Sequence, residues 1–174
     1  MPPFDRSTGD LDVVIDTPKG SRNKYAWNER LGRFSLSGVL PAGAVFPFDF
    51  GYVPGTRGGD GDPLDVLVLM DEPAFSGCHV LVRLVGVIEA AQTERDGETT
   101  RNDRLIGVAS KSPTHGDVRT LADLNAHLIE QVEHFFVSYN AIKGKRFEVL
   151  GRGGPRRART VVEQATLAPR RRRR

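Results

Sequence analysis

The sequence predicts a mainly β, α+β fold in which one long and one short helix flank a small closed β-barrel. Short runs of apolar and β-branched residues, separated by turn residues, dominate the first two thirds of the 174-residue chain. The run at 79–88 shows little strict alternation, which favours a strand buried on both faces of a closed barrel. A clear helical period of apolar residues appears only later in the chain.

Six strands are expected before the long helix, at 11–16, 24–27, 33–36, 66–69, 80–88 and 105–108. Thr120 can cap that helix, and Asp123 in its first turn suits the positive end of the helix dipole. Apolar residues at helical spacing carry the helix to about Tyr139. A strand near 147–150 and a short helix near 160–166 complete the predicted pattern.

The length and the cysteine content predict one domain in a reducing compartment. A chain of this size buries enough apolar surface to fold without disulfides, and we predict a single domain over residues 1–165. Cys78 is the only cysteine, which excludes an internal disulfide. Neither a signal peptide nor a long apolar run is recognised, so we expect a cytoplasmic protein that does not associate with membranes.

The formal net charge of +3 hides an asymmetry between the two ends of the chain. Residues 152–174 carry nine arginines and one glutamate, a net charge of +8, which leaves residues 1–151 at −5. We predict an Arg-rich disordered tail at 166–174, because a run of like charges repels itself. The tail has no aromatic residues for base stacking, so nucleic acid is not expected as a partner beyond non-specific contact.

Three carboxylates stand within six positions where a glycine-rich loop enters a predicted strand. They are Asp60, Asp62 and Asp65 of the segment D-G-D-P-L-D-V. Hard divalent cations prefer such oxygen ligands, and a bound Mg²⁺ or Mn²⁺ would offset the repulsion between the carboxylates. A solvated acidic turn is the alternative for an isolated motif of this kind. A calcium EF-hand is excluded, because the sixth position of the loop holds Asp65 instead of glycine.

Further motifs surround the aspartates in a characteristic order. They are Val13-Val14-Ile15-Asp16-Thr17-Pro18, Asn23-Lys24-Tyr25, the P-x-x-x-G-Y segment from Pro47 to Tyr52, and His134-Phe135-Phe136-Val137-Ser138-Tyr139. In order and spacing the chain resembles the soluble family I inorganic pyrophosphatases over residues 11–165. The resemblance implies an OB-like pyrophosphatase barrel, inorganic diphosphate as the substrate, Mg²⁺ as the cofactor and a homo-oligomer, usually a hexamer in prokaryotic relatives.

The resemblance also implies roles for individual residues. Asp60, Asp62 and Asp65 match the ligands of the catalytic metals, and the position of Asp62 also polarises the attacking water. Further metal ligands are expected in the loop at 94–104. There Asp96 is the best match for the first ligand, while Asn102 stands at the position of the second with Asp103 beside it as the alternative ligand.

Other positions match groups that contact the substrate or lie near the metals. Lys24, Arg104 and Tyr139 match phosphate-binding residues, with arginine in place of the family lysine at 104. Asp16 takes the place of a glutamate near the metals, and Tyr52 belongs to the expected site. Asn140 replaces a lysine that grips the leaving phosphate, and Lys143 or Lys145 could partly compensate.

Several substitutions remove groups that the family pattern contains. Ala26 replaces a carboxylate, Gly38 replaces a phosphate-binding arginine, and Phe46 and Phe50 replace tyrosines. We expect Mg²⁺-dependent hydrolysis of inorganic diphosphate. Two alternatives remain open: a degenerate homologue with a binding role, and a hydrolase of a larger phosphoanhydride or phosphoester for which the lost side chains leave room.

Overall fold

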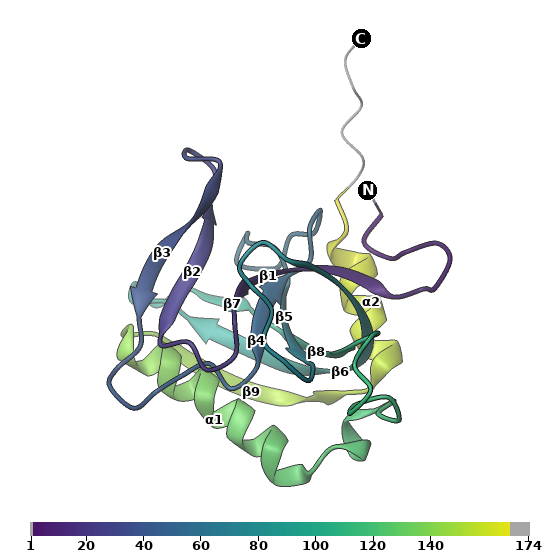
Figure 1. The fold of residues 1–174 in the computed structure, drawn as a ribbon. Coiled ribbons are helices and arrows are strands. Elements are labelled where there is room, and N and C mark those ends of the chain that lie inside the picture. Colours follow the sequence, from purple (N-terminus) through teal and green to yellow (C-terminus); the bar gives the residue numbers. More distant parts are fainter. Residues whose placement is uncertain (1, 168–174) are drawn as a thin grey trace.

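The computed structural model describes residues 2–167, which form nine strands, two α-helices and one short 3₁₀ helix (Figure 1). The strands are β1 (Leu11–Thr17), β2 (Asn23–Asn28), β3 (Arg33–Val39), β4 (Asp49–Tyr52), β5 (Asp65–Leu69), β6 (His79–Thr93), β7 (Thr99–Arg101), β8 (Arg104–Ala109) and β9 (Arg146–Gly153). The helices are η1 (Leu121–Asp123), α1 (Ala126–Ile142) and α2 (Pro155–Ala165).

Five of the strands close into a ring. β1 pairs with β4, β4 with β5, β5 with β8, β8 with β6, and β6 returns to β1. The pairing of β5 with β8 is parallel, and the other four are antiparallel. The far end of β6 also pairs with β7 and β9, and β2 and β3 form a separate hairpin that projects from the ring (Figure 1). The predicted fold class is confirmed.

Successive residues of the central strands enter two different apolar clusters. In β5, Val66 and Val68 pack with the cluster that includes α2, whereas Leu67 and Leu69 pack with the cluster that includes α1. Because neighbouring side chains of a strand point to opposite faces, each helix covers one face of this strand. This two-sided burial explains why the sequence shows apolar runs here instead of a polar and apolar alternation.

The predicted burial of the run at 79–88 holds for its second half only. Four consecutive residues, 85–88, are buried, whereas His79 and Leu81 at the start of β6 are exposed. The first part of β6 pairs with β1 and β8 at the rim of the ring, so solvent reaches one face of the strand there.

The long helix begins later than the sequence predicts. Thr120 and Asp123 form a capping box, but it caps η1, and Leu124 then returns to an extended conformation. Helix α1 starts at Ala126, with Asn125 as its N-cap: the Asn125 side chain accepts a hydrogen bond of 2.9 Å from the backbone N–H of His127. Helix α2 begins before the predicted residue 160, because Pro155 at its first turn is preorganised for a helix.

Two short strands were not predicted from the sequence. β4 contains Gly51 and lies between Pro47 and Pro54, a composition typical of a loop, and β7 has three residues. The polar residues of β7 are mostly exposed, so no apolar period marks them. Tertiary pairing with neighbouring strands makes both segments extended.

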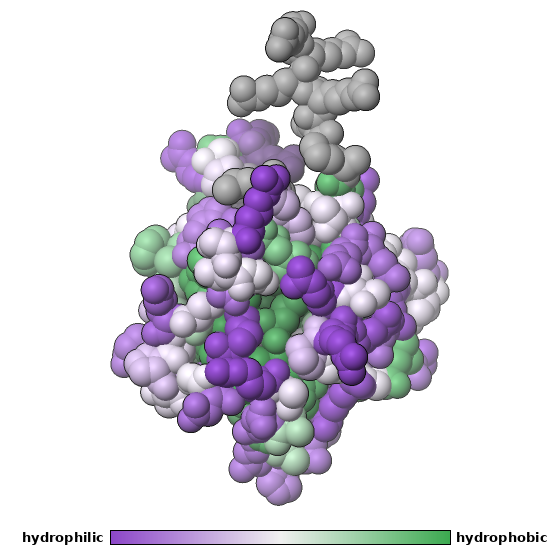
Figure 2. Space-filling view, turned by 90° about the vertical axis from the view of Figure 1, so that its right-hand side faces the viewer, coloured by the Kyte–Doolittle hydropathy of each residue, from purple (hydrophilic) through white to green (hydrophobic). Residues whose placement is uncertain are grey.

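The start of the predicted tail is paired with the loop that leads to the aspartates. Thr166 forms a bridge with Thr56, and the Leu167 N–H donates a hydrogen bond of 2.9 Å to the Gly55 carbonyl. The rest of that predicted tail, residues 168–174, lies outside the described residues. Hydrophilic side chains cover much of the face seen in Figure 2, and hydrophobic ones show through at its centre. None of the helices in residues 2–167 has the length and hydropathy needed to cross a membrane.

Candidate functional site

A cavity of about 580 Å³ collects most of the predicted site residues. The ring strands, the aspartate loop and the C-terminal end of α1 all contribute to its lining. The predicted residues that line it are Asp16, Lys24, Tyr52, Asp60, Asp62, Asp65, Arg104, Tyr139 and Lys145. Segments that are distant in the sequence therefore meet at one place.

The aspartate loop is folded tightly before it enters β5. One carboxylate oxygen of Asp60 accepts a hydrogen bond of 3.1 Å from the Asp62 N–H. A side chain at Gly59 would lie 2.7 Å from the Arg101 carbonyl, so glycine is needed for this close approach. Partial burial, together with the charges of Asp62 and Asp65, raises the pKa of Asp60. A cation at the loop would relieve this repulsion.

Two other carboxylates of the cavity already have cationic partners. Both oxygens of Asp16 lie 2.8 Å from the Lys24 ammonium nitrogen. Burial raises the pKa of Asp16 to about 6 even though Lys24 opposes the shift. Asp65 lies 2.6 Å from the Arg104 guanidinium. Within residues 2–167, the carboxylates of Asp60 and Asp62 have no such ion pair.

The chemistry of these free carboxylates suits a small hard cation. The part of the chain that the structure describes contains no group of three or more His, Cys, Asp or Glu side chains placed so that they alone could hold a metal ion. A cation that keeps several waters and shares its coordination with substrate phosphates does not need such a cage, because one or two carboxylates suffice. Asp60 and Asp62, with Asp65 beside them, provide that donor set.

A chain of hydrogen bonds that ends in an ion pair connects Arg104 to Lys145, both of which line the cavity. Arg104 donates to the side-chain oxygen of Asn102, whose amide nitrogen donates to Gln92 at 3.0 Å. Gln92 in turn donates to Glu94 at 2.6 Å, and Glu94 pairs with Lys145 at 2.8 Å. The sequence analysis missed Gln92, although an isolated amide after the apolar stretch of β6 was a usable signal.

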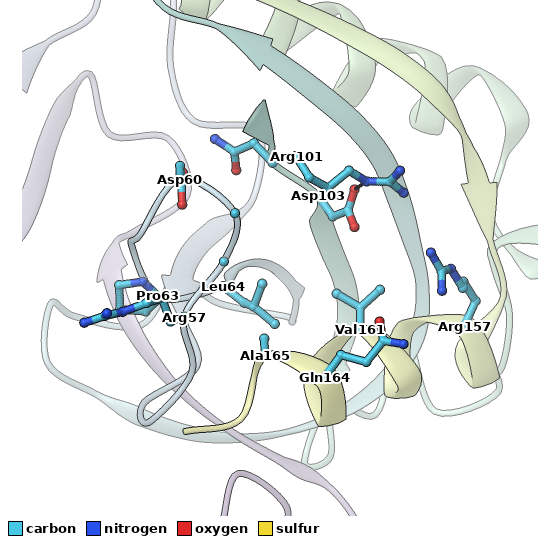
Figure 3. A pocket seen from close by; sticks show the side chains of 13 residues that line it. Arg57, Asp60, Pro63, Leu64, Arg101, Asp103, Arg157, Val161, Gln164 and Ala165 are labelled. Carbon is cyan, nitrogen blue, oxygen red and sulfur yellow. Dashed lines mark hydrogen bonds and ion pairs between the residues drawn. The ribbon is translucent and has the colours of Figure 1, made fainter. Parts of the chain in front are cut away.

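Asp103, one of the expected metal ligands, does not line this cavity. Its carboxylate accepts hydrogen bonds from the Ala90 N–H at 3.0 Å and from Arg101 at 2.6 Å. Figure 3 shows Asp103 beside Arg101 in a neighbouring cavity of about 310 Å³, which lies between the aspartate loop and α2. Neighbouring residues of an extended chain point in opposite directions, so the amide of Asn102 reaches the site network and the carboxylate of Asp103 does not.

Asp96, the other expected ligand, also lies away from the site. It occupies the exposed turn between β6 and β7, where its carboxylate accepts a hydrogen bond of 3.0 Å from the Glu98 N–H. The long hairpin carries this turn beyond the cavity, and Gln92 is the residue of β6 that faces the site. The amide of Asn102 stands at the position where the resemblance led us to expect the second carboxylate, and the amide of Gln92, not the carboxylate of Asp96, faces the site from β6.

The two phenylalanines that replace tyrosines form a wall behind Lys24. Phe46 and Phe50 are buried with their ring centroids 5.5 Å apart. The Lys24 ammonium lies 4.3 Å from the centre of the Phe50 ring and 5.6 Å from that of Phe46. The substitutions remove two hydroxyls but keep an aromatic surface that favours the charged lysine.

The C-terminal end of α1 brings a further cation to the cavity. Asn140 is buried and its amide donates to the Phe136 carbonyl at 2.8 Å, so its side chain stabilises helix α1. Lys143 lines the cavity and donates to the Tyr139 hydroxyl. Burial and the nearby positive charges, that of Lys24 above all, lower the pKa of Lys143 to about 8. Both lysines considered as replacements for residue 140 thus reach the site.

Burial and the charges of Asp65 and Asp16 raise the pKa of Tyr139 to about 12. Its hydroxyl therefore stays protonated at neutral pH. A protonated hydroxyl can donate a hydrogen bond to an anionic oxygen in the cavity.

Comparisons with known proteins show the family of the chain. The family model described as inorganic pyrophosphatase matches residues 13–168. An inorganic pyrophosphatase of Leifsonia xyli is 39% identical over 153 residues, which cover 87% of this chain and 91% of the relative. One from Synechocystis is 36% identical over 149 residues, with 86% and 85% covered. The crystal structure of the inorganic pyrophosphatase from Thermus thermophilus superposes with a TM-score of 0.85 at 32% identity, covering 95% of this chain and 94% of that one. The chain belongs to the family I soluble inorganic pyrophosphatases.

Proposed function

We propose that this protein catalyses the Mg²⁺-dependent hydrolysis of inorganic diphosphate to two orthophosphates, with Mn²⁺ as a possible substitute metal. One observation carries the proposal: the same cavity holds the free carboxylates of Asp60 and Asp62 and the cations of Lys24, Arg104 and Lys143. The acidic part suits a metal and the basic part suits phosphate. Relatives that cover most of the chain are named inorganic pyrophosphatase.

Asp60, Asp62 and Asp65 would hold the metal. When bound, Mg²⁺ offsets the negative charge of the phosphates and makes water a better nucleophile at neutral pH. The neutral amides of Gln92 and Asn102 add no negative charge to the site. We therefore expect this site to hold fewer cations than a site with carboxylates at those two positions.

Asp62 would also accept the proton of the attacking water, and the cationic residues and Tyr139 would position the substrate. The carboxylate of Asp62 has no hydrogen-bond donor among the described residues, so it is free to accept a proton from the attacking water. The oxygen of that water bonds to one phosphorus while the bond from that phosphorus to the bridging oxygen breaks. Lys143 and the protonated hydroxyl of Tyr139 donate hydrogen bonds to the departing orthophosphate. Arg104 is held by Asp65 and Asn102, so its guanidinium enters the reaction already oriented.

Oligomerisation, location and domain extent complete the proposal. The β2–β3 hairpin and the loop before β6 expose large apolar side chains, including Trp27, Leu36 and Phe75. Such surfaces favour burial between copies, and we propose a cytoplasmic homo-oligomer, a hexamer by resemblance, with its single domain over residues 1–165. Size-exclusion chromatography with light scattering measures the assembly, and a monomer at micromolar concentration would contradict it.

Phosphate release from inorganic diphosphate tests the activity. Wild-type protein should release two phosphates for each diphosphate with Mg²⁺ and none with a chelator. Asp62→Asn should lose at least about a hundredfold in kcat. Asp117→Asn, which removes the charge of an exposed aspartate outside the cavity, is the matched control and should retain activity. Equal turnover by wild type and Asp62→Asn would exclude this cavity as the active site.

A further inference from the structure

A second, smaller cavity of about 270 Å³ adjoins the catalytic cavity and is called the annex below. Lys24, Tyr139 and Lys143 line both cavities, so a single ligand can contact the two together. The remaining lining residues of the annex are small or mostly apolar: Ser37, Gly38, Val39, Leu40, Pro41 and Ile142. The annex therefore has a cationic side toward the catalytic cavity and an apolar side away from it.

Gly38 leaves the annex open. A Cβ atom at this position would meet no other atom within 4 Å, and the residue is not among the glycines with positive φ. Glycine is thus required here neither by its backbone conformation nor by close packing. Its consequence for the structure is the free space where the resemblance implies an arginine that would bind a small anion.

The apolar side of the annex is accessible to a ligand. Val39 is 56% exposed and Ile142 is 61% exposed, although both adjoin a cavity that carries several charges. Inorganic diphosphate offers nothing that would cover these side chains. A ligand with an anionic diphosphate and an apolar substituent would match both sides at once.

We propose that the site also accepts organic diphosphates, in which a short apolar substituent on one phosphate occupies the annex. This inference rests on the proposed function, because Asp60, Asp62 and Asp65 would hold the metal for both substrates and Asp62 would accept the proton of the attacking water in both reactions. The oxygen of water bonds to the terminal phosphorus, and the bond from that phosphorus to the bridging oxygen breaks. The products are orthophosphate and the organic monophosphate, and the proton released by water passes through Asp62 to solvent.

Binding of analogues that cannot be hydrolysed tests the annex without any turnover. Isothermal titration calorimetry in the presence of Mg²⁺ would compare methylenediphosphonate with its monobutyl ester. Complete burial of one methylene group strengthens binding by about fourfold. The annex is partly open, so we expect the butyl ester to bind about tenfold more tightly to the wild-type protein. Equal affinities, or weaker binding of the ester, would overturn the inference.

Variants on the two sides of the annex sharpen this test. Gly38→Arg fills the annex and should abolish the advantage of the butyl ester while retaining or strengthening binding of methylenediphosphonate. Ile142→Asn should reduce the advantage about threefold, since one apolar wall is lost. Val137→Asn changes an exposed residue of the same helix outside both cavities and should leave the advantage unchanged. An advantage that survives Gly38→Arg, or that is lost in Val137→Asn, would contradict the proposed location.

Parallel hydrolysis assays separate this inference from the proposed function. Release of orthophosphate from butyl diphosphate at a kcat/KM within about tenfold of that for inorganic diphosphate supports the inference. Hydrolysis of inorganic diphosphate with no release from butyl diphosphate overturns the inference and leaves the proposed function intact. Inactivity on both substrates overturns the proposed function and also the proposed hydrolysis of organic diphosphates. The calorimetry is independent of turnover, so it still reports whether the annex binds the substituent.

Discussion

Asp62 and Asp65 stand three residues apart in one motif, but only Asp65 forms an ion pair with a buried residue of the ring. Asp65 pairs at 2.6 Å with Arg104, whose side chain is 5% exposed and whose Nε atom has no partner among the described residues. Removing the charge of Asp65 leaves a buried cation without its counter-ion. We expect Asp65→Asn to lower the free energy of unfolding by about 2 kcal/mol, less than for a fully buried pair because the Asp65 side chain is 26% exposed.

Asp62→Asn should change the free energy of unfolding by less than about 0.5 kcal/mol, because its carboxylate is exposed and has no ion pair within residues 2–167. Urea denaturation measures both variants. Both should lose hydrolytic activity, so the two measurements together distinguish a residue that only serves catalysis from one that also stabilises the ring. Equal stability of the two variants would show that the pair of Asp65 and Arg104 contributes little.

The lowered pKa of Lys143 predicts that the capture of substrate depends on pH. Lys24, Lys145, Arg104 and Asp65 surround it, and burial with the positive neighbours lowers its pKa from 10.5 to about 8. The lysine is therefore charged below pH 8 and neutral above it, so kcat/KM should fall as the pH rises through about 8. The value of kcat should fall less, because a bound phosphate raises the pKa of the lysine.

Lys143→Arg keeps the charge at high pH and should remove this decline in kcat/KM. Lys143→Ala should lower kcat/KM about ten- to a hundredfold at pH 7, the range for a lost hydrogen bond to a charged group. A pH profile of Lys143→Arg identical to that of the wild type would assign the decline to another group.

At the scale of elements, the start of α1 gives the clearest test of local structure. Asn125 caps α1, which packs three buried apolar residues and Asn140, whereas Thr120 caps η1, which buries no residue. Asn125→Ala should therefore lower the free energy of unfolding by about 1 kcal/mol, and Thr120→Ala by less than about half of that. Thermal or urea denaturation measures the difference. A larger effect at Thr120 would indicate that η1 is the true start of the helix.

The same elements show what local sequence could and could not predict. The runs that became β5 and β8 were found because both faces of these strands are mostly apolar, and β1 was found from its β-branched run Val13-Val14-Ile15. Thr120 was predicted as the cap of the long helix, but the extended conformation of Leu124 that separates η1 from α1 depends on packing against the barrel. In the hairpin of β6 and β7, motif spacing could not settle which side chains face the site, because the extra residues extend the turn beyond the cavity.

For the whole molecule, the ring depends on contacts between distant segments. The pairing of β1 with β6 closes it and joins residues about seventy positions apart, which no local pattern specifies. Nine predicted residues nevertheless line one cavity. They could be named from the sequence because the resemblance, and not a local pattern, supplied the topology. The annex could not be predicted in this form: the glycine at 38 was visible in the sequence, but the apolar lining from β3 and α1 was not.

The central claim is that this cavity hydrolyses inorganic diphosphate with Mg²⁺ despite its substituted residues. Phosphorus-31 NMR of purified protein with diphosphate tests it most directly, since substrate and product give separate signals in one sample. We predict that the diphosphate signal is replaced by orthophosphate, two for each diphosphate, when Mg²⁺ is present, and that it persists with a chelator. A diphosphate signal that persists with Mg²⁺, in a sample whose circular dichroism shows folded protein, would contradict the claim.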